Sequence, residues 1–439
     1  MRRRVLPAVA AIGLLLALGA TGCGQQREVV RVGVLVDCAG LISQLRELTL
    51  AAAALPLLER GGELSDGGLV RGARRGRVGD RELELVPECT EITYAHLLIA
   101  ASRRLIEEQR VDVVVGPIGG PEGVVLRDIA ARYPEVTFLS GASVAQEVTL
   151  RDSQPNLFRF TPDGPQIVAG LGAYAYRDLG WRRAVVVADG YDEGWEFAAG
   201  FVAEFCALGG EIIERDFTTF FLPDATAAAK RHADADGVAL FANFFPVVPY
   251  LNAYAAVASP VERRLVLAGL SFVDQANLAP KGVDLTGVVL GGHVPLDRRF
   301  SSMDSYRESF KAAFPEFPPG APEGPSILAY YTAVEAIAAA LEETGGELGR
   351  GQRALRDALS ELVLEAPHGV VRLDRNRQAT GHIYLERITR VADGKATLTG
   401  VRLLDGVEQG FGGIFTAKTR PPSTTDPACE RRLPPHWAR

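Results

Sequence analysis

Short runs of β-branched and apolar residues alternate with longer stretches of helical period along most of this chain. The predicted strands span residues 29–36, 83–86, 111–115, 137–139, 184–187, 211–213, 238–241 and 265–267. Amphipathic stretches such as 45–58, 95–108, 123–133, 167–179 and 195–208 lie between them. Strands and helices that alternate in this way build parallel sheets covered by helices on both faces. The sequence therefore predicts an α/β fold of doubly wound parallel sheets.

The alternation occurs twice, and the two series are separated by residues 151–165, which are rich in Pro and Gly and have no apolar period. A chain of 439 residues is also too long for one ordinary hydrophobic core. We therefore interpret 151–165 as the first crossing between two lobes. Further on, the pattern predicts a strand at 288–290, helices at 303–314, 327–343 and 354–364, and a hairpin formed by 370–373 and 383–388.

The N-terminus has the composition of an export signal. Arg2, Arg3 and Arg4 precede an apolar run over 5–18, which is shorter than the roughly 20 residues that a membrane-spanning helix needs. The tetrad from Ala20 to Cys23 resembles the lipobox of bacterial lipoprotein precursors, although that pattern prefers leucine where Ala20 stands. We predict that residues 1–23 are a lipoprotein signal peptide with its lipobox and that Cys23 is acylated. An ordinary secretory signal is the alternative.

Charge and hydropathy limit the partners of the mature chain. Its net charge is -7, and acidic and basic residues are interspersed, so no basic stripe is available for nucleic acid. No second apolar stretch approaches membrane-spanning length. The sequence therefore predicts a protein outside the cytoplasm, attached to the cell membrane only through its lipid anchor.

Four cysteines remain if Cys23 carries lipid, and an oxidising compartment permits two disulfides with three alternative pairings. Cys38 and Cys89 each follow a predicted strand, so they can lie at the same edge of one sheet. We therefore predict a Cys38–Cys89 disulfide and, by elimination, a Cys206–Cys429 disulfide that attaches the C-terminal tail. Free buried thiols are the alternative.

The order of these elements resembles the branched-chain amino acid ABC transporter substrate-binding proteins, which have the type I periplasmic binding fold. The matching segments are Arg31-Val32-Gly33-Val34-Leu35, Glu59-Arg60-Gly61-Gly62, Cys89-Thr90, Val113-Val114-Val115-Gly116-Pro117, Leu139-Ser140-Gly141-Ala142-Ser143 and Tyr191-Asp192-Glu193-Gly194. The resemblance implies two doubly wound lobes joined by a hinge, which close around a small molecule and deliver it to an ABC transporter permease. We expect residues 28–150 with 283–362 in lobe 1, 151–282 with 363–412 in lobe 2, and a tail at 413–439.

In lobe 1, two loops that follow predicted strands are candidates for ligand binding. Gly119 and Gly120 precede a helix, where backbone N–H groups and the helix dipole favour a ligand carboxylate. Ser140 and Ser143 follow the fourth strand, where the resemblance implies hydrogen-bond donors. A tight structural turn explains the two glycines almost equally well.

In lobe 2, the resemblance implies that Tyr191 and Phe244 are aromatic residues of the cleft, although Phe244 also fits a core position. The family places a glutamate for the ligand's ammonium group where this chain has Ser271. Asp274 is a candidate substitute, but capping of a helix explains it as well. A standard α-amino acid ligand is therefore in doubt.

The residues do not predict catalysis. Gly141-Ala142-Ser143-Val144-Ala145 lacks the final glycine of a serine-hydrolase elbow, and the six histidines have no metal-ligand spacing. We expect no metal and no cofactor. The predicted function is that of a solute-binding lipoprotein for a small polar or amphipathic ligand, such as an amino acid or a related carboxylate or amide. The alternative is a ligand-sensing lipoprotein that acts on a membrane signalling partner.

Overall fold

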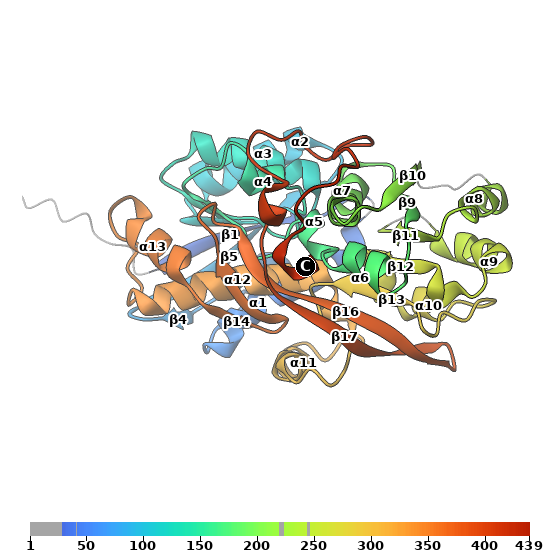
Figure 1. The fold of residues 1–439 in the computed structure, drawn as a ribbon. Coiled ribbons are helices and arrows are strands. Elements are labelled where there is room, and N and C mark those ends of the chain that lie inside the picture. Colours follow the sequence, from blue (N-terminus) through green and yellow to red (C-terminus); the bar gives the residue numbers. More distant parts are fainter. Residues whose placement is uncertain (1–28, 41, 219–223, 244–245) are drawn as a thin grey trace, which may run out of the picture.

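The computed structural model describes residues 29–40, 42–218, 224–243 and 246–439 (Figure 1). Cys23 and Phe244, two of the predicted functional residues, lie outside the described residues.

The first sheet has the strand order β4-β5-β1-β6-β7-β8. Its parallel strands are β1 (Val29–Asp37), β5 (Arg81–Thr90), β6 (Val113–Val115), β7 (Thr137–Leu139) and β8 (Leu157–Phe158), and β4 (Gly76–Val78) runs antiparallel to β5. Alternate residues of β1 are buried on opposite faces, with Val32 and Val34 in one apolar cluster and Leu35 in another. A strand buried on both faces needs helices on both sides.

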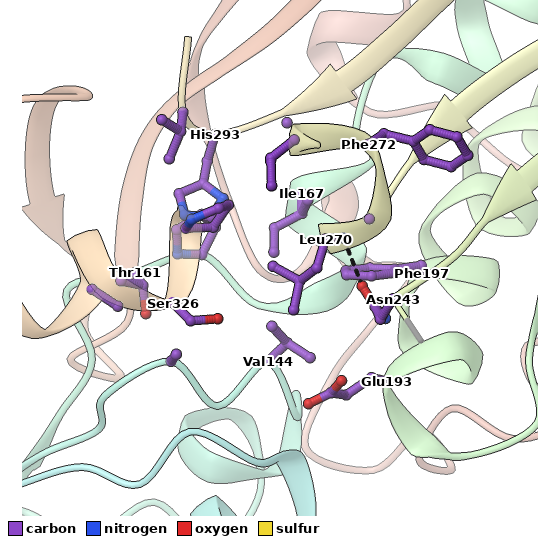
Figure 2. A pocket seen from close by; sticks show the side chains of 18 of the residues that line it. Val144, Thr161, Ile167, Glu193, Phe197, Asn243, Leu270, Phe272, His293 and Ser326 are labelled. Carbon is purple, nitrogen blue, oxygen red and sulfur yellow. Dashed lines mark hydrogen bonds between the residues drawn. The ribbon is translucent and has the colours of Figure 1, made fainter. Parts of the chain in front are cut away.

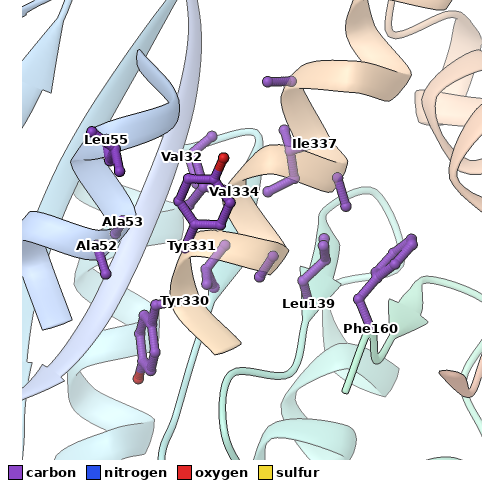
Figure 3. Close-up of a cluster of buried hydrophobic side chains, with 14 of the residues drawn as sticks. Val32, Ala52, Ala53, Leu55, Leu139, Phe160, Tyr330, Tyr331, Val334 and Ile337 are labelled. Atoms are coloured by element: carbon purple, nitrogen blue, oxygen red, sulfur yellow. The ribbon is translucent and has the colours of Figure 1, made fainter. Parts of the chain in front are cut away.

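Those helices are α1 (Arg46–Glu59) and α12 (Pro325–Glu343) on one face, and α2 (Ala95–Arg103) and α3 (Gly120–Arg132) on the other (Figure 1). Figure 3 shows Ala52 and Leu55 of α1 and Val334 and Ile337 of α12 in the larger cluster, with Tyr331 between the two helices. Because α1 and α12 are far apart in the sequence, this core is completed only when the chain returns to the first lobe.

The second sheet has the order β10-β9-β11-β12-β13-β16-β15-β14, with β17 paired to β16. It contains the parallel strands β9 (Arg183–Asp189), β10 (Glu211–Thr218), β11 (Gly237–Phe241), β12 (Leu265–Ala268) and β13 (Val289–Gly292). The helices α6 (Leu171–Arg177) and α7 (Asp192–Ala207) cover one face, and α8 (Ala225–His232) and α9 (Val247–Val257) cover the other. The predicted α/β fold with two doubly wound lobes is confirmed.

The C-terminal part of the chain crosses between the lobes. β13 still pairs with β12, and it lies beyond the boundary that we expected after residue 282. The next helices, α11 (Ser302–Ala313) and α12, pack on α1 in the first lobe. The strands β14 (Leu364–Ala366), β15 (Gly369–Leu373) and β16 (Ala379–Ala392) then lead back to β13, so the expected hairpin is present. The exact limits of the lobes remain a proposal.

Two features of the second lobe differ from the sequence prediction. The single helix expected at 167–179 is broken, because Gly170 has a left-handed φ of 86° between α5 (Gly164–Ile167) and α6. The long strand β17 (Lys395–Val407) was not predicted, and it pairs with β16 in antiparallel register. The remaining short elements are α4 (Glu147–Leu150), α10 (Gln275–Leu278), α13 (Arg353–Glu361), β2 (Glu63–Leu64) and β3 (Ala73–Arg74).

Both predicted disulfides, Cys38–Cys89 and Cys206–Cys429, are present. The second disulfide attaches the tail, but side chains and main-chain groups also hold it. The Arg151 guanidinium donates to the carbonyl oxygens of Thr419 and Arg420, and Trp437 packs against Phe411 with 5.1 Å between ring centroids. The tail therefore packs on the body although its sequence has no periodic apolar face.

Candidate ligand-binding cavity

A cavity lies between the two sheets, at the carboxyl ends of their parallel strands. From the first lobe it is lined by Ile92, Ile118, Ala142 and Val144, which follow β5, β6 and β7. From the second lobe it is lined by Asn243 after β11, Leu270 after β12 and His293 after β13, and by Glu193 and Phe197 of α7. The carboxyl edge is the usual ligand position in open α/β sheets.

Most of the cavity wall is apolar. Figure 2 shows Val144, Ile167 and Leu270 between two separate groups of polar side chains, with Phe197 beside Asn243. Glu193 and Asn243 lie at one end, and His293 lies at the other end with Ser326 and Thr161. This arrangement fits a ligand with an apolar body and polar groups at its ends.

Glu193 is the carboxyl group that faces the cavity from α7. It is 9% exposed, and burial raises its pKa to about 8, with the nearby charges of Asp192 and Asp189 acting in the same direction. The main-chain N–H of Gly120 across the lobe boundary lowers its pKa again, although by less. Glu193 therefore joins the wall of the cavity to the first lobe.

Asn243 links the two loops that form the second-lobe wall. Its main-chain N–H donates to Asp189 Oδ2 over 2.6 Å, and its side-chain oxygen accepts from the Leu270 main-chain N–H over 2.8 Å (Figure 2). These bonds fix the loops after β9, β11 and β12 relative to one another. Asn243 thereby positions Leu270 against the cavity.

The other carboxyl group that lines the cavity, Glu386, is hydrogen-bonded to main-chain groups of the protein. It accepts hydrogen bonds from the main-chain N–H groups of Leu296, at 2.9 Å, and Asp297, at 2.7 Å. Burial raises its pKa to about 6. Because these N–H groups occupy its oxygens, we assign Glu386 a structural role in holding the segment after β13.

Two buried histidines stand at the opposite end of the cavity. The rings of His293 and His368 are nearly perpendicular, with centroids 5.8 Å apart. Burial lowers the pKa of His293 to about 4 and that of His368 to about 3, so both rings are neutral at neutral pH. Neither nitrogen of His368 has a hydrogen-bond partner among the described residues. A neutral imidazole at the wall can donate or accept one hydrogen bond.

The predicted residues of the first lobe lie beside the lining residues rather than among them. The Gly119 N–H donates to Glu122 Oε2 over 3.3 Å, and the Ser143 hydroxyl donates to the Gly120 carbonyl over 3.3 Å. Ser140 is 1% exposed. The structure thus brings these four residues together at the edge of the first lobe, where Gly119 and Ser143 bond to the protein and the Ser140 hydroxyl has no hydrogen-bond partner among the described residues.

The predicted residues of the second lobe are more dispersed. Tyr191 precedes α7 and is partly buried; its phenol interacts with Asn243, and burial with the Glu193 and Asp189 charges raises its pKa. Ser271 lies in the turn after β12, where its N–H donates to the Ala242 carbonyl. Asp274 is exposed and caps α10 by accepting from the Ala276 N–H over 2.9 Å.

Sequence reasoning did not select Glu193, Asn243 or His293. Glu193 lies within the Tyr191-Asp192-Glu193-Gly194 segment that carried the resemblance. His293 comes just after the predicted strand at 288–290, so its position at a strand's carboxyl end was the signal that could have found it.

One group of potential metal ligands lies away from the cavity, on β10 and α8. Within the described residues, Glu214, Asp216 and His232 bring ligand atoms within 4.8 Å of one another. The Arg231 guanidinium already pairs with both carboxylates, at 3.4 Å and 3.0 Å. We interpret this group as an ion-pair network.

The family model for periplasmic binding proteins matches residues 29–395. The chain belongs to the periplasmic binding protein family. The members of this family are non-enzymatic solute binders that work outside the cytoplasm, which agrees with a cavity between two lobes and with the fold recognised from the sequence. No helix within the described parts of the chain is long and apolar enough to cross a membrane.

Solved structures of the same fold align over most of the chain. An ABC transporter substrate-binding protein from Sphaerobacter thermophilus is 25% identical, with a TM-score of 0.72, over 87% of this chain and 99% of that chain. A solute-binding protein from Rhodopseudomonas palustris in complex with 3,4-dihydroxybenzoic acid is 20% identical, with a TM-score of 0.69 and coverage of 87% and 99%. A branched-chain amino acid binding protein from Streptococcus pneumoniae in complex with isoleucine is 15% identical, with a TM-score of 0.63 and coverage of 85% and 99%. The comparison with curated proteins found no match.

Proposed function

We propose that this protein is the lipid-anchored solute-binding component of an ABC importer and that it binds a small amphipathic molecule between its lobes. The observation that carries the proposal is the cavity at the carboxyl ends of both sheets, with apolar walls and polar groups at two ends. The solved structures hold a benzoic acid derivative or an amino acid, both of which combine an apolar body with polar groups. Acylation of Cys23 would keep the protein at the membrane beside its permease.

Thermal unfolding of the purified protein against a panel of amino acids, amides, amines, aromatic acids and sugars tests binding. A ligand that binds only the native state stabilises it, and the stabilisation grows with the logarithm of ligand excess over the dissociation constant. We expect selective shifts from small compounds that have an apolar body and a polar end. Shifts from sugars alone would contradict the proposal, because the Leu270 and Phe197 walls offer few hydrogen-bonding groups.

Mass spectrometry of the protein from membranes tests the anchor. Acylation predicts that the mature chain starts at Cys23 and carries extra mass from acyl chains. A mature chain that starts elsewhere and carries no lipid would contradict the anchoring and leave the binding function in place.

A further inference from the structure

The N-terminus of α3 is the position where the sequence suggested a ligand carboxylate, but protein carboxyls already occupy its N–H groups. The Gly119 N–H donates to Glu122 Oε2 over 3.3 Å. The Gly120 N–H interacts with the carboxyl of Glu193, which reaches across from the second lobe. Both main-chain donors that would hold an anion are therefore in use by the chain's own acids.

The two lobes also meet too closely at this point for a ligand group to fit between them. A Cβ atom added to Gly120 would lie 2.2 Å from Asp192 Oδ2 and 3.7 Å from Glu193 Cγ. A side chain at position 120 would collide with the Asp192 carboxyl unless the Asp192 side chain moved away. A ligand carboxylate is larger than a methyl group, so it does not fit beside Gly120 while the Asp192 side chain stays in this position.

The surroundings of Glu193 are acidic on both sides of the lobe boundary. Asp189 and Asp192 raise its pKa from the second lobe, and the charge of Glu122 does so from the first. Asp37, at the carboxyl end of β1, is 2% exposed, and burial raises its pKa to about 6, although the Ile92 main-chain N–H that interacts with its carboxyl acts in the opposite direction. Asp37 in turn raises the pKa of Glu122, after the larger effect of burial.

The cavity lining offers no compensating positive charge. Its described residues include no lysine and no arginine, and the His293 imidazole is neutral. Glu386, the remaining charged group, is held by main-chain N–H groups. An anionic ligand would therefore meet a group of carboxyls with no cation to pair with it, which is costly in a buried site.

We propose that the ligand is an organic cation, an apolar body that carries an amine or amidine group, and that this group pairs with Glu193. The inference rests on the proposed solute-binding function and specifies the charge of its ligand. The apolar body lies against Leu270, Ile167 and Phe197, and the far end of the ligand meets His293 and Ser326. A charge-assisted hydrogen bond to a buried carboxylate supplies the selectivity over neutral and anionic compounds of the same shape.

Three compounds of equal size and different charge test the proposal: benzamidine, benzamide and benzoate. Thermal unfolding of the full-length protein is measured with each, alongside phenethylamine and hexylamine as further cations. We expect the cations to raise the unfolding temperature and benzoate to leave it unchanged. Glu193→Gln should weaken cation binding about 30-fold or more, since the loss of one partner of a buried charge pair costs at least about 2 kcal/mol.

The matched control is Glu343→Gln, which removes the same charge from an exposed position at the end of α12. This variant should bind the cations as the unchanged protein does. A shift with benzoate and none with the cations would overturn the cation inference while supporting the solute-binding function. Cation binding that survives in a folded Glu193→Gln variant would also overturn it, as would the absence of a shift with every cation.

Discussion

Gly120→Ala is the substitution that most directly tests how the lobes close. The new Cβ would lie 2.2 Å from Asp192 Oδ2, whereas ordinary van der Waals contact begins at 3.4 Å. The lobes must therefore separate by about 1 Å, or the Asp192 side chain must leave the α7 N–H groups that it accepts from. Overpacking of this kind costs about 1–3 kcal/mol. If the closed, ligand-bound state alone bears that cost, the dissociation constant rises about 5-fold to 150-fold.

Isothermal titration with a compound that stabilises the unchanged protein measures this effect. Asp192→Ala in the same chain removes the colliding carboxyl, so the double variant should recover most of the affinity. Asp192→Ala alone should cost up to about 1 kcal/mol of stability from the lost helix-end interaction, and its affinity is the reference for the double variant. Gly324→Ala is the control, because its Cβ would meet no atom closer than 3.7 Å. Unchanged affinity in Gly120→Ala, or no recovery in the double variant, would refute the close approach of the lobes.

Three further predictions concern the tail, the buried histidines and the cavity. Replacing Cys206 and Cys429 by serine should lower the free energy of unfolding by up to about 5 kcal/mol, since the disulfide closes a loop of 223 residues. Urea unfolding measures this loss, and an unchanged free energy would mean that the tail contacts alone hold the tail. The pKa of His368 is about 3 in the folded protein, below the 6.5 of an exposed histidine. The stability that the neutral ring contributes to the folded protein is therefore lost progressively as the pH falls below 6.5. His368→Gln should therefore gain about 2 kcal/mol relative to the unchanged protein between pH 7 and pH 5, and a constant difference in urea unfolding over that range would contradict the burial of a neutral ring. Tyr191→Ala should weaken ligand binding in titration without unfolding the protein, and a large loss of thermal stability in the ligand-free variant would assign Tyr191 to the core instead.

The fold could be predicted because parallel strands buried on both faces appear in the sequence as short, nearly continuous apolar runs. β1 is almost entirely apolar, and β7 begins and ends where the pattern placed it. β17 has no continuous apolar run because it is exposed along much of its length. The break at Gly170 was missed because the apolar period continues through it, whereas the helix is interrupted by one residue with positive φ.

The position of the candidate site could be predicted, but the side chains that form it could not. Strand order places the loops after β6 and β7 at the carboxyl edge of the first sheet and those after β11 and β12 at the carboxyl edge of the second, and these loops line the cavity. Which residue of a loop faces inward depends on the backbone of that loop. Ile118, Ala142 and Val144 line the cavity beside the predicted Gly119 and Ser143.

The acidic side chains at the lobe boundary link the charge of the proposed ligand to closure of the two lobes. Closure brings Asp192 and Glu193 of the second lobe to Gly120, near Glu122 of the first lobe. The pKa of Glu193 and that of Glu122 both rise to about 8 in the folded protein, mainly through burial, so these carboxyls favour the protonated form near neutral pH when no cation is bound. Because their pKa values lie above the usual value near 4.5, the stability that these groups contribute to the folded protein is present at low pH and is lost as the pH rises through about 8. An organic cation at Glu193 replaces the proton, so it binds the closed state better than the open one, and that difference in affinity is what allows a ligand to drive closure.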